Sequence, residues 1–300
     1  MLINCYDTVQ ELYAAVYGKI LHEGDLVSPR GMPTYEIIGA SGRVLNPRAR
    51  LIRRPGKAMS LPFAMGEFLW YLRRSNKLDI MSYYSKSMVH YSDDKRTLNS
   101  AYGSRIWGCH DFISVNQWQA AKRLLLSDKN SRQAVLHIRV PQDEVFYSLD
   151  HPCTLTLQFL LRNNRLHLLV TMRSNDLFMG SCYDIFSFTM LQEMMAWELG
   201  VEIGFYQHTV NSWHLYERDI CDAQLLYTGN SVEMPKFSFD DKSIDSILAA
   251  EENIRLKRSF DENKRPCGPW KAWWDVLYAY ANKQPIPFEK IDDCYKFISR

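Results

Sequence analysis

The chain has 300 residues, 46% of them hydrophobic, which is enough for a substantial core in one large α/β domain or two small ones. Lys and Arg number 36 against 34 Asp and Glu, so no overall charge attracts nucleic acid or a membrane surface. Any anion site must therefore be local. No apolar run approaches the roughly 20 residues that span a bilayer.

The seven cysteines stand at positions 5, 109, 153, 182, 221, 267 and 294. Their number is odd, their spacing is wide and no CxxC pair occurs, which argues against a disulfide framework and against a zinc site. No basic and apolar leader follows Met1. We expect free thiols, no metal ion and a cytoplasmic protein.

The first residues predict a helix and a loop. Residues 5–22 carry apolar side chains at helical spacing, which is typical of an amphipathic helix. Two prolines and a glycine then predict a loop at 28–33. Arg30 at its centre is either a solvated charge or a ligand for an anion.

Strands are expected at 35–39 and 43–45, and the basic run 48–57 is typical of a solvated face. A proline followed by apolar residues at helical spacing predicts a buried helix at 61–72. Glu67 lies inside that apolar pattern. Its carboxylate needs partners or a raised pKa, so it is either paired structurally or part of a site.

The middle of the chain predicts a helix at 117–126 and a strand at 134–140. The segment 149–153, Leu-Asp-His-Pro-Cys, then leads into two apolar runs at 155–161 and 166–171. Their length and composition predict a pair of strands.

The stretch 172–184 brings Arg173, Asp176, Gly180 and Asp184 into one short turn before a helical pattern begins. An arginine and a glycine in such a turn are typical of an anion-binding pocket. The structural alternative is a tight turn with Gly180 at a demanding backbone angle and a helix with charged caps.

The next helical pattern ends at Gly200, and strands are expected at 201–206 and 209–210. His214 and Tyr216 follow. Because they are two residues apart, their side chains point the same way on a strand and apart on a helix.

The last eighty or so residues predict helices at 244–257 and 270–282. The second helix carries three tryptophans, Trp270, Trp273 and Trp274. Tryptophans at that spacing more often pack against the body of a fold than form a platform for stacking bases. We therefore expect a single domain over 1–300 with a helical C-terminal extension at about 220–300.

Together these pieces resemble the thymidylate synthase family over roughly 30–219. The family pairs a Pro-Cys nucleophile with an Arg-Ser-x-Asp motif, a Gly-x-x-aromatic-Asn motif and a His-x-Tyr motif. The matching residues here are Pro152-Cys153, Arg173-Ser174-Asn175-Asp176, Gly180 to Tyr183-Asp184, His214-Leu215-Tyr216, Glu67 in Glu-Phe-Leu-Trp, and Tyr102-Gly103. The resemblance implies an α/β (α+β) fold with a large mixed β-sheet flanked by helices, and a homodimer built through the sheet face.

Asp184 points to a subgroup. Thymidylate synthases have Asn at this position, whose amide accepts from uracil N3–H and donates to O4. Cytosine presents the reverse pattern, which a carboxyl group fits better. Thr154 follows the nucleophile, where thymidylate synthases usually have histidine or serine. Both residues resemble the deoxycytidylate hydroxymethylases, which implies conversion of dCMP, 5,10-methylenetetrahydrofolate and water to 5-hydroxymethyl-dCMP and tetrahydrofolate.

Three alternatives stay open. The first is a CMP 5-hydroxymethylase of a nucleoside secondary-metabolite pathway, although Ser174 matches the enzymes that act on deoxynucleotides. The second is a thymidylate synthase acting on dUMP, in which hydride in place of water gives a methyl product. The third is a homologue that binds nucleotide or RNA without catalysis, against which Cys153, Glu67 and Arg173 argue.

The resemblance also implies catalytic and cofactor-binding roles. Cys153 adds to C6 of the pyrimidine and makes C5 nucleophilic, and Arg173 lowers the pKa of the thiol. Asp184 hydrogen-bonds or protonates N3, and Glu67 relays protons through ordered water. The family match further assigns Tyr102 to the catalytic group and three residues to the folate, Asp176, Gly180 and Glu67.

The nucleotide phosphate is expected at Arg30, Arg173 and Ser174, with Arg132 contributed across a dimer interface. His214 and Tyr216 are expected to hydrogen-bond the sugar 3′-hydroxyl. Gln158 is expected in the dimer-side sheet.

The sequence departs from the family at three places. Gln133 replaces the second arginine of the phosphate site. The tryptophan that lines the folate site is absent, with Met81 or Tyr83 nearest. The short apolar tail that closes over folate is also absent.

Overall fold

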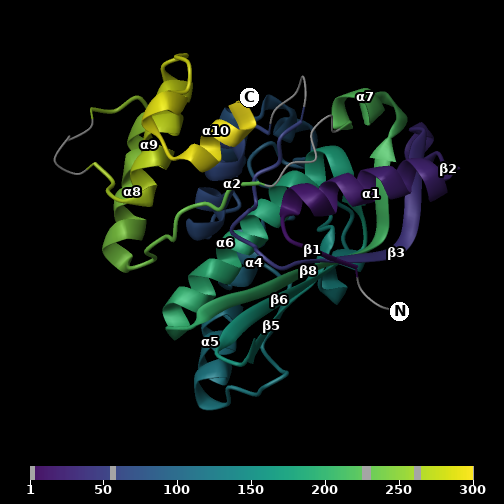
Figure 1. The fold of residues 1–300 in the computed structure, drawn as a ribbon, viewed down its shortest axis with the longest axis horizontal. Helices are drawn as coiled ribbons and strands as arrows, with labels where there is room; N and C mark the ends of the chain where they lie inside the picture. The colour runs from purple at the N-terminus through teal and green to yellow at the C-terminus, as the bar shows by residue number, and fades with distance from the viewer. Residues whose placement is uncertain (1–3, 55–58, 225–230, 260–264, 300) are drawn as a thin grey trace.

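The computed structural model describes residues 4–54, 59–224, 231–259 and 265–299, and it is built around a mixed sheet of eight strands (Figure 1). The strands are β1 (Asn4–Tyr6), β2 (Asp25–Val27), β3 (Thr34–Val44), β4 (Val135–His137), β5 (Thr154–Arg162), β6 (Arg165–Met172), β7 (Asn175–Asp176) and β8 (Glu202–Tyr216). Their order is β1-β3-β8-β6-β5-β4, with β2 paired to β3 and β7 paired to β8. The β1–β3, β6–β8 and β7–β8 pairs are parallel and the others antiparallel. The expected large mixed sheet flanked by helices is confirmed.

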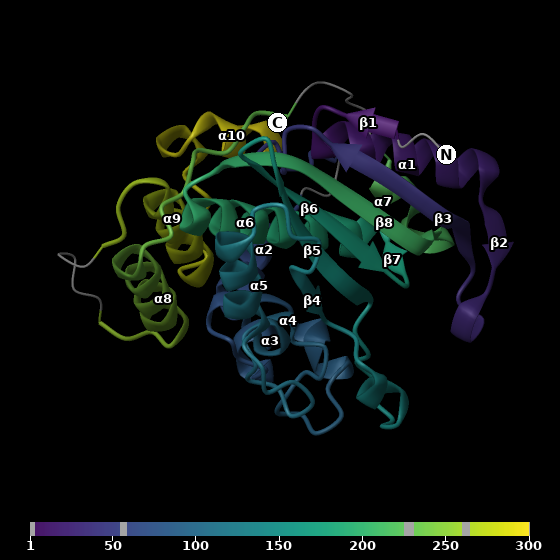
Figure 2. The same ribbon diagram turned by 90° about the horizontal axis from the view of Figure 1, so that it is seen from below.

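The helices are α1 (Val9–Glu23), α2 (Leu61–Leu72), α3 (Leu78–Tyr84), α4 (Tyr102–Ile106), α5 (Gln117–Ser127), α6 (Cys182–Leu199), α7 (Ile220–Ala223), α8 (Asp241–Arg255), α9 (Pro269–Ala281) and α10 (Asp293–Ser299). Figures 1 and 2 both place α8 and α9 at one end of the molecule and β2 at the other. In the part of the chain that the structure describes, no helix combines the length and apolar character needed to cross a membrane.

The two faces of the sheet have different surroundings. Along β5, β6 and β8 nearly every second side chain is buried, and most of those between are half-buried. The buried face packs against helices that include α6. The half-buried face carries cross-strand pairs such as Arg43 with Gln207 (3.0 Å) and Ser41 with Thr209 (2.9 Å). Gln158 alternates with buried Leu157 and Phe159 along β5, which places it on this half-buried face.

Strand β3 joins the two segments that the sequence suggested as separate strands. Gly42, which lies between those two segments, has a packing role. A Cβ there would lie 2.3 Å from Leu12 Cδ1, so α1 can cross the sheet closely only over a glycine. The expected strand at 134–140 is shorter, as β4. Gly200 ends α6 in the left-handed conformation, as expected.

The expectation of a solvated face for the basic run is wrong at Arg50 and Arg54. Arg50 is fully buried and forms an ion pair of 2.5 Å with Glu193 of α6. Arg54 is also buried and donates to the Phe178 carbonyl at 2.6 Å. Each guanidinium is tolerated in the interior because it meets a carboxylate or a carbonyl there. Residues 55–58 of this run lie outside the described residues.

The C-terminal helices share the core of the sheet-bearing part. Trp273 of α9 is fully buried, with its ring 5.9 Å from that of Phe68 on α2 and 6.0 Å from that of Phe186 on α6. Its indole N–H donates to the hydroxyl of Tyr295 at 3.0 Å. The expected helices are therefore present, and their tryptophans pack against the body of the fold. That the whole chain forms one domain stays a prediction.

Candidate active site

Cys153 lies immediately before β5, at the point where this strand meets the end of β6. Its carbonyl accepts a hydrogen bond of 2.9 Å from the backbone N–H of Arg173. The Arg173 guanidinium turns back to the same loop and donates to the carbonyls of Pro152 (3.0 Å) and His151 (3.1 Å). Cys153 is a free, half-buried thiol. The strand pairing thus places the arginine beside the cysteine, although 20 positions separate them in the sequence.

Burial raises the pKa of the Cys153 thiol, and the positive charge of Arg173 lowers it. The charges of Asp184 and Asp150 raise it further, whereas Arg139 lowers it. The expected lowering effect of Arg173 is confirmed, but the net shift of the thiol pKa is upward. The effect of Arg173 has the expected sign, but burial outweighs it because a thiolate is poorly solvated inside the protein.

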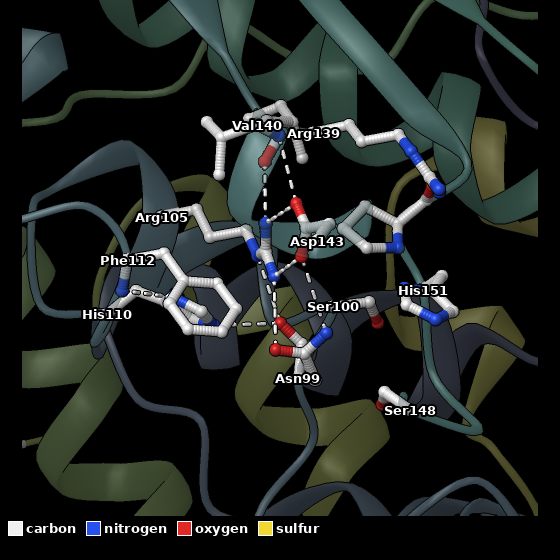
Figure 3. A network of polar contacts seen from close by, with 12 residues as sticks. Asn99, Ser100, Arg105, His110, Phe112, Arg139, Val140, Asp143, Ser148 and His151 are labelled. Carbon is white, nitrogen blue, oxygen red and sulfur yellow. Dashed lines mark hydrogen bonds and ion pairs between the residues drawn. The ribbon is translucent and has the colours of Figure 1, made fainter. Parts of the chain in front are cut away.

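A buried ion pair supports the loop before Cys153 (Figure 3). Arg105 donates to both carboxylate oxygens of Asp143 at 2.7 Å, and both side chains are fully buried. Asn99, which also bonds this pair, donates to the Asp150 carbonyl at 3.1 Å. The bidentate geometry fixes the position of the loop that ends at Cys153.

Arg139 is a second cation at this loop, and sequence reasoning missed it. Its guanidinium donates to the Pro152 carbonyl at 3.2 Å and pairs with Glu144 at 2.7 Å. Pro152 O therefore accepts from both Arg139 and Arg173. The local sequence around Arg139 gives no sign of this contact. The contact forms only because β4 pairs with β5, which lies further along the chain.

Asp184 lies in the first turn of α6 and is half-buried. Its Oδ2 accepts a hydrogen bond of 2.8 Å from Asn175 Nδ2. Burial raises the pKa of this carboxyl to about 7, against the lowering effect of the Asn175 bond. Near neutral pH the group is therefore divided between its acidic and ionised forms.

Asn175 is itself held by buried residues that sequence reasoning did not assign to the site. Its Oδ1 accepts from the Ser181 hydroxyl at 2.6 Å and lies 3.0 Å from His208 Nε2. His208 Nδ1 lies 2.7 Å from the hydroxyl of Tyr206. Tyr206 and His208 occupy alternate positions on the buried face of β8. Two polar residues at that spacing in an apolar strand were the available signal.

Glu67 is half-buried on α2, whose neighbouring residues are mostly buried. Its Oε2 accepts from the Ser187 hydroxyl of α6 at 3.4 Å, and no other hydrogen bond or ion pair to its carboxyl is present among the described residues. Burial and the negative charge of Asp184 raise its pKa to about 8. An unpaired, protonated carboxyl fits a residue of a site better than a structural ion pair.

Tyr102 on α4 is buried next to Thr154, the residue that follows Cys153. Its hydroxyl accepts from the backbone N–H of Thr154 at 3.4 Å, and its ring stacks on Phe188 with centroids 5.9 Å apart. Burial, together with the charges of Asp184 and Cys153, raises its pKa well above the usual value. The hydroxyl therefore keeps its proton.

His214 and Tyr216 lie on one face of β8, as their spacing predicted for a strand, with ring centroids 5.4 Å apart. Asp176 pairs with His214 in the sheet, and its carboxylate accepts from the backbone N–H groups of Phe178 (3.0 Å) and Met179 (3.1 Å). The structural alternative of a charged cap is therefore correct for Asp176. Each carboxylate oxygen still has room for a second hydrogen bond.

Gly180, in the turn η4 (Leu177–Ser181), does not have the demanding backbone angle that was considered. It is required for another reason. A Cβ at this position would lie 2.7 Å from Asn175 Nδ2, so a side chain would displace the amide that bonds Asp184.

Two of the three remaining phosphate candidates are exposed. Arg30 lies in the short turn η1 (Pro29–Gly31) with a left-handed φ of 55°, and its side chain is exposed. Arg132 and Gln133 are exposed before β4. Ser174 is half-buried next to Arg173. No hydrogen bond or ion pair between described residues links the side chain of Arg30 or Arg132 to the Cys153–Asp184 region.

Comparisons with known proteins agree with this geometry. Residues 11–258 match the family model described as thymidylate synthase. A deoxyuridylate hydroxymethyltransferase of Bacillus phage SP01 is 32% identical over 219 residues, covering 70% of this chain and 57% of the relative. A second, of Delftia phage PhiW-14, is 27% identical over 187 residues, covering 58% of this chain and 51% of the relative.

The thymidylate synthase of Bacillus atrophaeus is 27% identical over 187 residues, covering 60% of this chain and 81% of the relative. The chain thus spans little more than half the length of the two phage hydroxymethyltransferases. The family model, in contrast, covers most of the chain, including every residue of the candidate site. The chain belongs to the thymidylate synthase family.

Proposed function

We propose that the chain is a pyrimidine nucleotide C5 one-carbon transferase, and most specifically a cytidylate 5-hydroxymethylase. The observation that carries this proposal is the grouping of Cys153, Asp184 and Glu67. The charge of Asp184 raises the pKa of both other groups, and all three are half-buried rather than sealed. A nucleophile, an acid that is mostly protonated near pH 7 and a second acid that is half protonated there are what C5 chemistry on a pyrimidine requires.

Cys153 is the proposed nucleophile. Its thiolate forms a bond from Sγ to C6, and the electron pair of the C5–C6 double bond moves into the ring. A hydrogen bond or proton from Asp184 to N3 stabilises the charge that develops there, so recognition and activation share one contact. After C5 has taken up the one-carbon unit and lost its proton, the bond to Sγ breaks and the thiolate leaves.

The one-carbon donor proposed is 5,10-methylenetetrahydrofolate, which supplies the methylene carbon that water then converts to hydroxymethyl. The residues present fit this group. Asp176 retains free acceptor capacity for a ring rich in N–H donors, and Glu67 is an unpaired acid for proton transfer. Gly180 lies in the same turn as the residues that Asp176 caps.

The choice of dCMP rests on Asp184. An acid that donates to N3 and accepts from the N4 amino group matches the edge of cytosine. The second candidate substrate is dUMP. It is favoured by the names of the two phage relatives and by the pKa of about 7, because a neutral carboxylic acid also has a donor for O4.

A homodimer through the half-buried sheet face is also proposed. Ile38 of β3 is 78% exposed, and Gln158 faces the same side of the sheet. Arg132 is exposed at the edge strand, where it is available to a second subunit. We place the protein in the cytoplasm on the strength of its free thiols.

The deciding experiment incubates the protein with dCMP, CMP or dUMP and methylenetetrahydrofolate. Release of tritium from C5 and the mass of the nucleotide product are measured, with Cys153→Ala as the control. We expect hydroxymethyl-dCMP. Turnover of dUMP alone, with the absorbance of dihydrofolate, identifies a thymidylate synthase and contradicts the proposal.

A further inference from the structure

A buried chain of hydrogen bonds leads from the core of the sheet to Asp184. Its members are Tyr206, His208, Asn175, Ser181 and Trp213. All five are buried, whereas Asp184 at its end is half-buried. This series of hydrogen bonds therefore begins in the buried core of the sheet and ends at the candidate site.

The directions of these bonds follow from the inventory of donors. Trp213 Nε1 is a donor only, so Ser181 Oγ accepts from it at 2.8 Å and uses its own hydrogen on Asn175 Oδ1. Burial lowers the pKa of His208 to about 3, so its ring is neutral and has one N–H. Tyr206 donates to Nδ1 and His208 donates from Nε2 to Asn175 Oδ1, which gives every hydrogen an acceptor.

Asn175 is consequently locked in one orientation. Its Oδ1 accepts two bonds, so its Nδ2 faces Asp184 Oδ2 as a fixed donor at 2.8 Å. Gly180 leaves the space for this contact, because a Cβ there would collide with Nδ2. Reversing the amide would set it against two donors at once.

This fixed orientation matters because a neutral carboxylic acid can carry its proton on either of its two oxygens. With the proton on one oxygen it presents donor then acceptor along a base edge, and with the proton on the other it presents acceptor then donor. The donor-then-acceptor order matches one of the two bases, cytosine and uracil, and the acceptor-then-donor order matches the other base. A free carboxyl group can adopt both.

We infer that Asn175 is a specificity-determining positioning residue, which keeps Asp184 Oδ2 an acceptor and leaves only Oδ1 to present a proton to the base. Among the described residues, the groups whose charges interact with that of Asp184 are Glu67, Tyr71, Tyr102, Cys153, Asp176, Cys182 and Tyr206. None of these groups is a cation, and in this part of the chain only the amide of Asn175 forms a hydrogen bond to one of the two carboxyl oxygens of Asp184. This inference rests on the proposed contact between Asp184 and the base, but it does not depend on which base is preferred.

The test is equilibrium binding of dCMP and of dUMP to the full chain at neutral pH, followed by tryptophan fluorescence or calorimetry. The variants are Asn175→Ala, which removes the donor, and Tyr206→Phe, which removes only the bond that fixes the His208 tautomer. The matched control is Gln192→Met. Gln192 is fully buried on the same helix as Asp184 and bonds three carbonyls, including that of Gly204.

We expect the ratio of the two dissociation constants to approach one in Asn175→Ala, a loss of about tenfold in discrimination. Tyr206→Phe should lose a smaller part, and Gln192→Met should keep the ratio of the parent while losing thermal stability. If Asn175→Ala does not fold, the result for Tyr206→Phe decides.

An unchanged ratio in variants that fold and bind overturns the inference. Failure of the parent protein to bind either nucleotide overturns the proposed function, and the inference with it. A parent that prefers dUMP, with the preference lost in Asn175→Ala, contradicts the cytidylate assignment and supports the inference.

Discussion

The two ends of the candidate site are built differently. At the base end, Asp184 is reached by a chain of buried hydrogen bonds that lies entirely within one subunit. At the proposed phosphate end, Arg30 and Arg132 are exposed, and Arg173 donates from Nε to the Pro152 carbonyl and from Nη2 to the His151 carbonyl. The base end is complete in the single chain. The phosphate end lacks a fixed arrangement of its cations.

In the proposed function, one end of the site selects the base and the other end binds the phosphate. A fixed donor and acceptor pair discriminates between bases because a mismatched base leaves buried polar groups unpaired. In the proposed function, the exposed arginines contribute affinity for any nucleoside monophosphate, and their side chains become ordered when the phosphate or a second subunit binds. Changes at the base end should therefore alter which nucleotide is used, and changes at the phosphate end should alter how tightly all nucleotides bind.

The largest expected effect is at the nucleophile, which both ends serve. Cys153→Ser should reduce turnover by at least about 10³-fold, because a serine hydroxyl is far less nucleophilic than a thiolate. Release of tritium from C5 measures it. Cys109→Ser, at an exposed thiol, is the control and should retain full activity. Similar losses in both variants would contradict the assignment of Cys153.

Asp184→Asn should break the selectivity of the base end. An amide donates where the acid accepts, so the preference should move toward dUMP by about 100-fold in the ratio of kcat/KM values. Competition between dCMP and dUMP in one reaction measures the ratio directly. A uniform loss for both nucleotides, with the ratio unchanged, would show that Asp184 does not read the base.

Arg132→Gln should weaken dCMP and dUMP binding equally, by about tenfold, if it contacts phosphate. Its place across the interface is tested by mixing Arg132→Gln subunits with Cys153→Ser subunits. Half of the random dimers then contain one intact site, so about a quarter of the parental activity should return. No recovery after demonstrated subunit exchange contradicts a contribution from the partner subunit.

The pH dependence tests the state of the two acids. Asp184 and Glu67 have pKa values raised to about 7 and about 8, so both are protonated below these values and lose their protons as the pH rises through them. The thiolate form of Cys153 increases over the same range, so kcat/KM for dCMP is divided by the thiolate fraction obtained from alkylation rates, and this quotient should fall about tenfold between pH 7 and pH 8.5. The pH at which this quantity falls should shift in Glu67→Gln. A flat profile over this range would contradict the acid role of both groups.

The smallest effect is expected from Arg139, the cation beside the Cys153 loop. Its charge lowers the pKa of the thiol, so Arg139→Met should raise that pKa and slow alkylation at neutral pH by about threefold. The rate of iodoacetamide labelling against pH measures this. Arg123→Met, at an exposed position of α5, is the control. The same pH dependence of labelling in Arg139→Met and Arg123→Met would contradict an effect of Arg139 on the Cys153 thiol.

The candidate site residues could be predicted from the sequence mainly because their motifs resemble those of the family. Cys153 after a proline, Glu67 in an apolar helix and Asp184 at a helix start could all be identified without coordinates. The strand pair around Cys153 followed from composition alone, and its pairing placed Arg173.

Other features depend on partners far away in the chain. Arg50 looked solvated because its carboxylate partner, Glu193, lies 143 residues further on. The net rise in the pKa of Cys153 depends on how much protein surrounds the thiol, which no local pattern reports. His208 fell between the strands expected at 201–206 and 209–210, and its partner Asn175 comes from β7, 33 positions away in the chain.

Trp273 of α9 packs against Phe68 of α2 and Phe186 of α6. These are the same two helices that carry Glu67 and Asp184. A protein shortened before α9 would leave a hole behind both acids.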